Sequence, residues 1–293
     1  MLEMSRPATS VPVDALHPLL LDPILTGALR EDLGWGDLTT SLVLDADASA
    51  MADVVYRDSG IVAGLPVLER AFHLVDPAIV VDKIAAEGAQ VASGDVVAHV
   101  SGPAQGILSA ERVALNLVQR MSAVATMAFK FAEKLAGTRA RLLDTRKTTP
   151  GLRMLERYAV RVGGGRNHRF CLSDAILIKD NHIALAGSLA EAVRRARRGS
   201  PVTAKVEVEV ETLFQVQEAL AAGADMLLLD NMSTDDLEQA VALVGGRVPV
   251  EASGGITLKT ATAVARTGVD FISSGSITRL AGFLDIALDI RTD

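Results

Sequence analysis

The sequence predicts an α/β protein whose second half is built on parallel strands. Hydrophobic residues make up 49% of the 293 positions but aromatic residues only 3%, so the core must consist mainly of Ala, Val, Leu and Ile, as in buried parallel sheets. In the second half of the chain, short apolar runs alternate with amphipathic segments. Several of these segments end in a Gly-containing turn that leads directly into the next apolar run. Such repeats indicate a parallel barrel or a doubly wound sheet.

The N-terminal part of the chain is less regular. Residues 1–18 are rich in Pro, Ser and Thr and are predicted to form a loose arm. Strand-like runs between Gly and Asp turns follow at 51–57, 61–67, 78–84 and 94–102. Residues 109–137 then predict one long helix, because Leu, Val, Met and Phe recur at helical spacing and Gly137 provides a stop.

Strands and helices alternate through the rest of the chain. Strands are predicted at 140–144, 175–180, 204–210, 225–230, 248–253 and 269–274. Helices are predicted at 152–160, 188–198, 211–223, 234–244 and 257–267. No Gly-rich dinucleotide fingerprint follows any of these strands, which disfavours a Rossmann fold.

Polar residues stand where these predicted strands end. They are, in order, Asp144 with Arg146 and Lys147, then Lys179, Glu209, Asp230, Ser253, and Ser274 with Gly275. Because the C-terminal strand ends of a β/α barrel line its active site, this regular placement predicts that these side chains share one site.

A cationic segment, residues 144–182, lies within an otherwise acidic chain. It holds eight Lys or Arg and four Asp or Glu, a net charge of +4, whereas the whole chain has a net charge of −7. Such a segment favours a small, highly charged anion, which predicts an enzyme that acts on phosphates, carboxylates or both. The acidic balance of the whole chain argues against nucleic-acid binding.

The chain has no recognisable targeting segment and no apolar run long enough to cross a membrane. Its single cysteine, Cys171, rules out an internal disulfide and fits a reducing compartment. We therefore expect a cytoplasmic protein with no membrane partner.

Two adjacent cations, Arg146 and Lys147, are flanked by hydroxyl side chains and followed by Pro150 at a predicted helix start. The free backbone N–H groups of a helix start add to such an anion site, although a solvated basic turn is the alternative. Lys179 ends an apolar strand, where a cation is unfavourable unless it meets an anion.

Three glycines, 163–165, precede a second cationic group that includes His168 and Arg169. Glycines allow the backbone to approach a ligand closely, although a flexible linker is the alternative. His168 and Arg169 suit a planar carboxylate, because Arg can bind it through two parallel hydrogen bonds.

Glu residues alternate with Val over 207–211, so all three Glu share one face of the strand, which in a barrel is the lumen. Glu209 together with Asp230 is a candidate pair for Mg²⁺, held through oxygens or water. The small residues at 253–255 and 274–276 match the phosphate site common after late barrel strands; tight turns are the alternative.

Ordered motifs along nearly the whole chain closely resemble one family. They are EDLGWGDLTT at 31–40, ERVALN at 111–116, DTRKTTPGLR at 144–153, GGGRNHR at 163–169, LIKDNH at 177–182, AGADMLLLDNMS at 222–233, EASGGIT at 251–257 and TGVDFISSGSIT at 267–278. The family is quinolinate phosphoribosyltransferase, also called nicotinate-nucleotide pyrophosphorylase (carboxylating).

The resemblance implies a type II phosphoribosyltransferase fold. An N-terminal open α/β sandwich would span 19–118 and be joined by the C-terminal tail 281–293, and an α/β barrel would span 119–280. The implied reaction joins quinolinate to phosphoribosyl pyrophosphate with Mg²⁺ and releases nicotinate mononucleotide, pyrophosphate and CO₂, a step of de novo NAD synthesis. The implied assembly is a homodimer, or a higher oligomer, in which the N-terminal domain of one subunit completes the active site of the other.

The resemblance also implies roles for individual residues. Contact with quinolinate across the dimer would come from Arg112. The two carboxylates of quinolinate would be held by Arg146, His168 and Arg169. The space between quinolinate and the donor phosphates would be lined by Lys147 and Lys179. The ribose hydroxyls and Mg²⁺ would be held by Glu209 and Asp230. The 5′-phosphate would be bound by Ser253, Gly254, Gly255, Gly275 and Ser276.

One motif departs from the family pattern. Where the family usually reads GALTHS or GALTKH, this chain reads GSITRL at 275–280, so that Arg279 and Leu280 stand in place of the expected His or Lys. Two alternatives to the quinolinate enzyme are a molybdenum-transport-associated homologue and a non-catalytic anion-binding homologue. The intact IKDNH and NHR motifs favour the quinolinate enzyme, and binding alone would not require both the cations and the Glu209–Asp230 pair.

Overall fold

A computed structural model describes residues 16–291, so the arm predicted at 1–18 lies almost wholly outside the described residues. The chain forms two compact units. The first consists of residues up to Phe129, Thr149–Gly164, and the residues from Leu280 onward. The second consists of Lys130–Thr148 and Gly165–Arg279.

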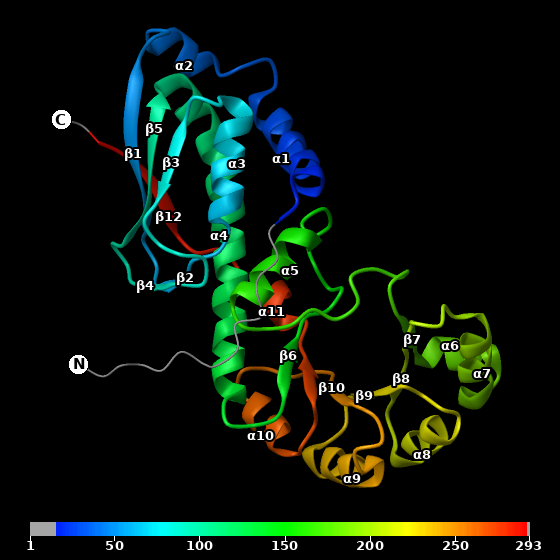
Figure 1. Ribbon diagram of the computed structural model, residues 1–293. Helices are drawn as coiled ribbons and strands as arrows, with labels where there is room; N and C mark the ends of the chain where they lie inside the picture. Colours follow the sequence, from blue (N-terminus) through cyan, green and yellow to red (C-terminus); the bar gives the residue numbers. More distant parts are fainter. Residues whose placement is uncertain (1–15, 292–293) are drawn as a thin grey trace. The chain divides into compact units, whose positions relative to one another are not determined.

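An antiparallel sheet forms the centre of the first unit (Figure 1). In spatial order its strands are β12 (Ile286–Ile290), β1 (Ser49–Tyr56), β5 (Val96–Pro103) and β3 (Val80–Lys83). A two-stranded sheet joins β2 (Gly60–Ile61) to β4 (Gln90–Val91). The helices are α1 (Pro18–Leu33), α2 (Leu38–Val43), α3 (Leu65–Val75), most of α4 (Ala104–Leu135) and α5 (Arg153–Val162). β12 pairs antiparallel with β1, so the last strand of the chain lies beside the first.

The strand predicted at 61–67 is wrong beyond its first residue, which belongs to β2. The rest leads into α3, which begins at Leu65 with Pro66 in its first turn, where the missing N–H is not needed. Leu65, Leu68 and Phe72 are buried. Their spacing places them on one face of a helix, and this helical spacing prevails over the short strand-like run.

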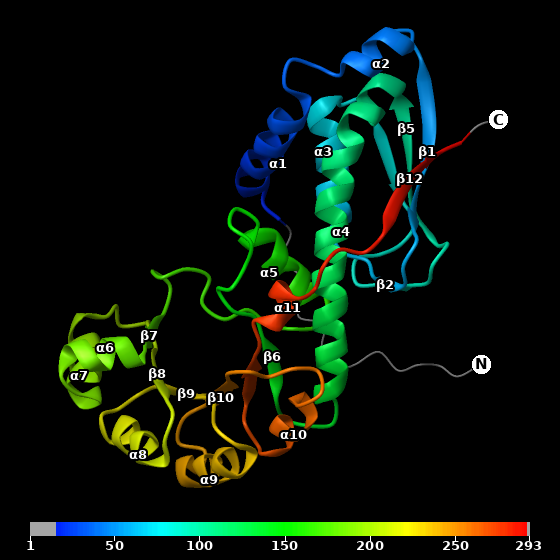
Figure 2. The same ribbon diagram turned by 180° about the vertical axis from the view of Figure 1, so that it is seen from behind.

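Six parallel strands form one curved sheet in the second unit, as Figures 1 and 2 show from opposite sides. In spatial order they are β6 (Arg141–Leu143), β11 (Phe271–Ser273), β10 (Val250–Ser253), β9 (Met226–Asp230), β8 (Val206–Val210) and β7 (Ile176–Ile178). All five pairings are parallel. The α/β prediction is confirmed. Among residues 16–291 no strand pairing joins β6 to β7, so these two strands are the edges of an open sheet.

The helices that lie along the outer side of the curve (Figure 1) are α6 (Asp180–Ala186), α7 (Leu189–Gly199), α8 (Leu213–Ala221), α9 (Thr234–Val244) and α10 (Ala261–Arg266). The single turn α11 (Ser276–Arg279) comes directly after β11, at the end of the strands. Ser188, Thr212 and Ser233 cap α7, α8 and α9, because each side chain accepts a backbone N–H from the first turn. Because the strands are parallel, their C-terminal ends all lie at the same edge of the sheet.

The long helix predicted at 109–137 is present as α4, which begins earlier, at Ala104, and ends at Leu135. Within the described chain, neither α4 nor any other helix is sufficiently long and apolar to span a membrane.

Candidate active site

The C-terminal ends of the parallel strands bring most of the predicted site residues to one edge of the sheet. β6 leads to Arg146 and Lys147, β7 to Lys179, and β11 to Gly275 and Ser276, while β8 carries Glu209, β9 ends at Asp230 and β10 ends at Ser253 before Gly254 and Gly255. His168 and Arg169 come from the segment between α5 and β7. Arg112 lies apart from this group in the sequence, on α4 in the first unit, with a side chain that is 60% exposed and 3.6 Å from the Glu111 carboxylate.

Lys179 and Glu209 form an ion pair between neighbouring strands. Lys179 is the residue that precedes α6, and its backbone N–H donates to Nδ1 of His182 at 2.9 Å. The side chain of Glu209 is only 12% exposed, whereas that of Lys179 is 43% exposed. The pair therefore presents a cation and a carboxylate side by side at the sheet edge.

The loops after β9 and β10 interlock around Asp230. Asn231 adopts a left-handed conformation with φ 55°, its side-chain amide donates to Asp230 Oδ2 at 2.7 Å, and its backbone N–H donates to the carbonyl of Ser253 at 3.0 Å. A Cβ atom at Gly254 would lie 2.2 Å from Asn231 Oδ1. Gly254 is thus required for the contact that orients the Asp230 carboxylate.

The loop after β11 surrounds Lys147. The hydroxyl of Thr278 donates to the carbonyl of Lys147 at 2.7 Å, and a Cβ atom at Gly275 would lie 2.8 Å from Cδ of Lys147. The hydroxyls of Ser274 and Ser276 are 2.6 Å apart. A cation, two hydroxyls and a glycine are therefore held together, which is the composition of a phosphate site.

Arg146 and Arg169 place two guanidinium groups near each other. Burial, and secondly the positive charge of Arg146, lower the pKa of Arg169. Two cations in this arrangement favour an anion that can contact both. Nη1 of Arg169 also donates to the carbonyl of Ala175 at 3.2 Å, which fixes one side of the guanidinium.

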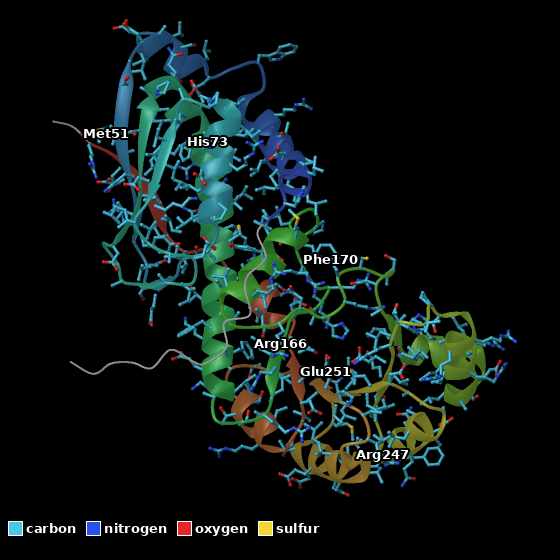
Figure 3. The ribbon with its side chains drawn as sticks, in the orientation of Figure 1. Met51, His73, Arg166, Phe170, Arg247 and Glu251 are labelled. Atoms are coloured by element: carbon cyan, nitrogen blue, oxygen red, sulfur yellow. The ribbon has the colours of Figure 1, made fainter. Side chains whose placement is uncertain are left out.

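His168 lies in a cluster with two buried carboxylates. Its Nε2 is 2.9 Å from Glu207 on β8 and 3.4 Å from Glu251 on β10, which Figure 3 labels. Its Nδ1 accepts the backbone N–H of Arg169 at 2.7 Å. Our sequence analysis noted that Glu207 faces inward but missed Glu251. The signal was present, because an acid within the apolar run VPVEAS is unfavourable unless it is paired.

The cluster retains a proton at neutral pH. Burial acts to lower the pKa of His168, but the contacts with Glu207 and Glu251 outweigh it and raise the pKa. Burial also raises the pKa of Glu251. The three groups titrate together and keep one extra proton among them. Because Nδ1 accepts the backbone N–H of Arg169, that proton is shared between Nε2 and the two carboxylates, and Nδ1 carries none.

The first glycine of the Gly163–Gly165 run serves helix packing rather than close approach to a ligand. A Cβ atom at Gly163 would lie 2.2 Å from the carbonyl oxygen of Ala125 on α4. The absence of a side chain therefore lets the end of α5 lie directly against α4 within the first unit.

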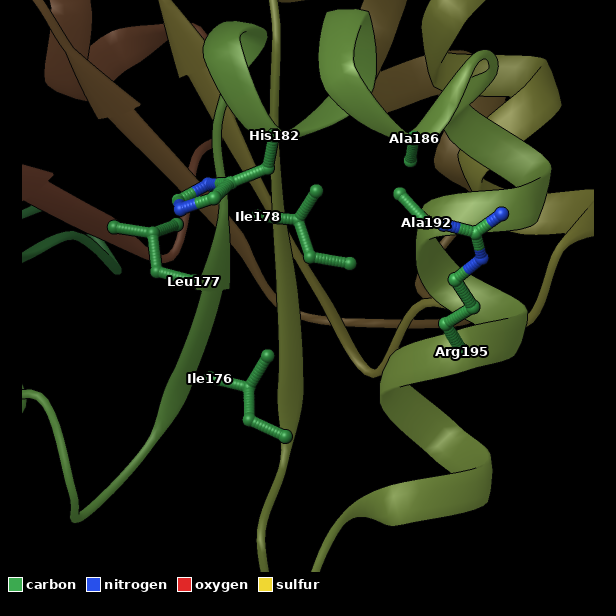
Figure 4. A pocket seen from close by; sticks show the side chains of 7 residues that line it. All are labelled: Ile176, Leu177, Ile178, His182, Ala186, Ala192 and Arg195. Carbon is green, nitrogen blue, oxygen red and sulfur yellow. The ribbon is translucent and has the colours of Figure 1, made fainter.

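A shallow hollow of about 250 Å³ lies beside β7 (Figure 4). Its lining consists of Ile176, Leu177, Ile178, His182, Ala186, Ala192 and Arg195. None of the predicted site residues is in this lining, and most of the lining is apolar. The hollow is therefore lined by residues other than the polar group at the strand ends, although His182 borders that group through its hydrogen bond with Lys179.

Two family descriptions match the chain. Residues 37–122 match "Quinolinate phosphoribosyl transferase, N-terminal domain", and residues 124–289 match the C-terminal domain of the same family. The "Probable nicotinate-nucleotide pyrophosphorylase [carboxylating]" of Bacillus subtilis (strain 168) is 43% identical over 94% of this chain and 95% of its own length. The "Nicotinate-nucleotide pyrophosphorylase [carboxylating]" of Mycobacterium leprae (strain TN) is 42% identical over 90% of this chain and 94% of its own.

Solved structures agree with the fold. The crystal structure of NadC from Streptococcus pyogenes is similar with a TM-score of 0.92 and 42% identity, covering 96% of this chain and all of its own. The nicotinate-nucleotide pyrophosphorylase from Francisella tularensis has a TM-score of 0.91 and 36% identity, covering 97% of this chain and all of its own. With both domains matched and close relatives aligned over nearly their full length, the chain belongs to the quinolinate phosphoribosyl transferase family.

Proposed function

We propose that this protein transfers the phosphoribosyl group of phosphoribosyl pyrophosphate to quinolinate, with loss of CO₂, and forms nicotinate mononucleotide for NAD synthesis. The observation that carries the proposal is the assembly of cations, two carboxylates and small hydroxyl residues along one edge of the sheet, in a chain of this family. The site holds groups for both anions and for a ribose.

Quinolinate carries two carboxylates on a pyridine ring, and we assign them to Arg146 and Arg169. Burial, and secondly the positive charge of Arg146, lower the pKa of Arg169, and both effects are offset when a carboxylate binds. The predicted third contact, His168, has both ring nitrogens in hydrogen bonds or ion pairs with the protein.

Lys147 and the Ser274–Ser276 loop suit the phosphates of the donor, since they combine a cation with hydroxyls and a closely packed glycine. Glu209 and Asp230 lie on neighbouring strands and suit the ribose hydroxyls. Their oxygens also fit Mg²⁺ chemically, and a bound Mg²⁺ would offset the charge of the pyrophosphate.

The chemistry requires positioning and charge rather than a protein nucleophile. The pyridine nitrogen forms a bond to C1 of the ribose while the C1–O bond breaks and pyrophosphate leaves with the electron pair. The ring nitrogen is then positive, so the electrons of the C2–carboxylate bond stay on C2 as CO₂ departs, and a proton takes its place. Fixed cations at the strand ends support both steps by holding the reactants in place.

The assembly and location follow the same proposal. We expect a homodimer, or a higher oligomer built from it, in which Arg112 contacts quinolinate bound to the partner subunit. The single cysteine, Cys171, is free and agrees with a reducing cytoplasm.

The test is to incubate the protein with phosphoribosyl pyrophosphate, Mg²⁺ and either quinolinate or nicotinate, and to measure nicotinate mononucleotide. Nicotinate lacks the 2-carboxylate and would lose one charged contact with the site, at roughly 2–5 kcal/mol, so it should be used far less well. Equal use of both compounds would contradict the proposed site. Failure with quinolinate would favour the molybdenum-transport-associated or anion-binding alternative.

A further inference from the structure

The segment 165–175, between α5 and β7, carries predicted site residues but forms no helix and only one isolated bridge, between Arg166 and Leu143. Most cationic loops of this kind lie at the surface and vary in conformation. This one is instead attached to the sheet by three buried carboxylates, each from a different strand or strand end. Figure 3 labels Arg166 and Phe170, which bracket the attached part.

The first carboxylate is Asp144, which directly follows β6 and is completely buried. It accepts the side-chain amide of Asn167 at 2.5 Å and the backbone N–H of His168 at 2.8 Å. A buried carboxylate without such donors would be strongly unfavourable. Asp144 therefore fixes the backbone just before the ring of His168.

The other two carboxylates, Glu207 and Glu251, hold the ring itself through Nε2. Glu251 is almost wholly buried from solvent, and neither of its carboxylate oxygens forms a hydrogen bond of good geometry. Its contact with His168 Nε2, at 3.4 Å, is an ion-pair distance. At its other nitrogen the ring accepts the N–H of Arg169. The ring therefore connects two strands of the sheet to the backbone of Arg169.

One histidine and two carboxylates within 4.8 Å of one another could also bind a metal ion. The hydrogen bond at Nδ1 argues against it. A histidine that binds metal through Nε2 normally carries its proton on Nδ1 and donates it to an acceptor. Here Nδ1 faces an N–H donor, so a metal at Nε2 would require a ring without any proton.

We propose that Glu207 and Glu251 are positioning residues that act through His168: they fix its ring, and the ring fixes the backbone N–H of Arg169 and thereby the direction of its guanidinium. This inference rests on the proposed function, because its kinetic test measures the Michaelis constants for quinolinate and phosphoribosyl pyrophosphate. Because both ring nitrogens are engaged within the protein, His168 acts as the connection and Arg169 as the contact to quinolinate.

The kinetic test compares Glu251→Gln and Glu207→Gln with the wild type. Gln keeps the size of the side chain but loses the charge that holds the ring. The Michaelis constant for quinolinate should rise by about 10- to 100-fold, as expected for a displaced substrate-binding group, while that for phosphoribosyl pyrophosphate changes by less than about twofold. Glu87→Gln, a buried carboxylate of the first unit, is the matched control and should leave both constants unchanged.

Two outcomes of this comparison overturn the inference. One is an unchanged constant for quinolinate in both variants. The other is an equal rise for both substrates, which would indicate general loosening of the unit. If the wild type does not turn over quinolinate at all, the proposed function fails, and that result is distinguishable from either of these.

A spectroscopic test observes the His168 ring of the wild-type protein directly. The chain has only five histidines, so ¹⁵N-labelled histidine gives few signals, and His168→Gln identifies the one of interest. At neutral pH, Nδ1 of His168 should be unprotonated; a protonated Nδ1 would overturn the inference.

Titration with Zn²⁺ alone should give the same number of bound ions for the wild type and Glu251→Gln. Loss of one Zn²⁺ in the variant would instead establish a metal site.

Discussion

Two glycines at the strand ends show how closely the loops of the site fit around single side chains. At Gly275 an added Cβ atom would meet Cδ of Lys147, a flexible side chain that can move aside. At Gly254 the added atom would meet Asn231, including its backbone nitrogen at 2.6 Å. The second position is the stricter one, because the backbone of Asn231 is held by Ser253 and cannot move without releasing Asp230.

Replacing Gly254 with Ala should lower the free energy of unfolding by about 2–5 kcal/mol, because the new atom overlaps Asn231 and the backbone has φ +89°. It should also raise the Michaelis constant for phosphoribosyl pyrophosphate. Gly255→Ala is the matched control: its φ is +61°, but no atom lies near its Cβ position. The control should lose only about 1–2 kcal/mol. Chemical denaturation measures both, and equal losses would contradict the proposed overlap.

Arg279, which stands where the family usually has His or Lys, is exposed at the end of α11, and its backbone N–H donates to the carbonyl of Gly275. If it neutralises a donor phosphate, Arg279→Ala should raise the Michaelis constant for phosphoribosyl pyrophosphate by about fivefold, or about 1 kcal/mol for a partly exposed charge. The constant for quinolinate should stay the same. Steady-state kinetics with each substrate varied in turn decide this, and wild-type values throughout would make Arg279 a surface residue.

At the scale of elements, most of the parallel strands were predictable because they are buried on both faces and consist largely of apolar residues. β9, for example, contains Leu227, Leu228 and Leu229, all buried. The start of α3 was not predictable from a short apolar run, because strand and helix differ there only in the burial that distant parts of the chain impose. Glu251 was missed although its place within an apolar run was visible, because its partner His168 lies far away in the sequence.

Glu87 links two helices of the first unit and makes its stability depend on pH. Its carboxylate accepts the N–H groups of Gly64 and Leu65 at the start of α3 and the hydroxyl of Tyr158 on α5. Burial raises its pKa above 4.5. A carboxyl whose pKa is raised by folding stabilises the protein most below its unfolded pKa, and this contribution is lost as the pH rises through the folded pKa.

Glu87→Gln should therefore make the thermal midpoint less dependent on pH above about 4.5, since Gln has no proton to lose. Differential scanning calorimetry across this range measures the slope. Glu191→Gln serves as the control, because the hydrogen bonds from Arg194 and Arg195 lower the pKa of Glu191 to about 2. Its contribution is constant above pH 4.5 and lost only in acid. A slope that Glu87→Gln leaves unchanged would rule out this role of Glu87.

At the scale of the whole molecule, the position of most candidate site residues at the strand ends could be predicted from the sequence, because chemistry-bearing residues follow each apolar run. Arg112 could not be placed in this way, since it lies within a helix, and its assignment came only from the family resemblance. Its exposed side chain, paired loosely with Glu111, is suited to a contact outside its own unit.

Complementation tests the proposed sharing of sites. Arg112→Ala and Lys179→Ala should each be inactive, but mixed and exchanged subunits should recover about one quarter of wild-type activity, because about half of the dimers are hybrids with one intact site each. Subunit exchange is verified by tagging one variant. Verified exchange without recovery would show that Arg112 acts within its own subunit or not at all. As the negative control, mixing two samples of Lys179→Ala should recover no activity.

The pairing of β12 with β1 has a consequence for how the protein is made. Arg291 bonds to Asp53, 238 residues earlier in the chain, and the first unit also requires Thr149–Gly164. On the ribosome one edge of β1 therefore stays unpaired until β12 has been synthesised. Most of the second unit lies in one continuous stretch, Gly165–Arg279, which is made before β12 and can assemble first. The sheet that contains β1 is thus completed after the unit that follows it in the chain.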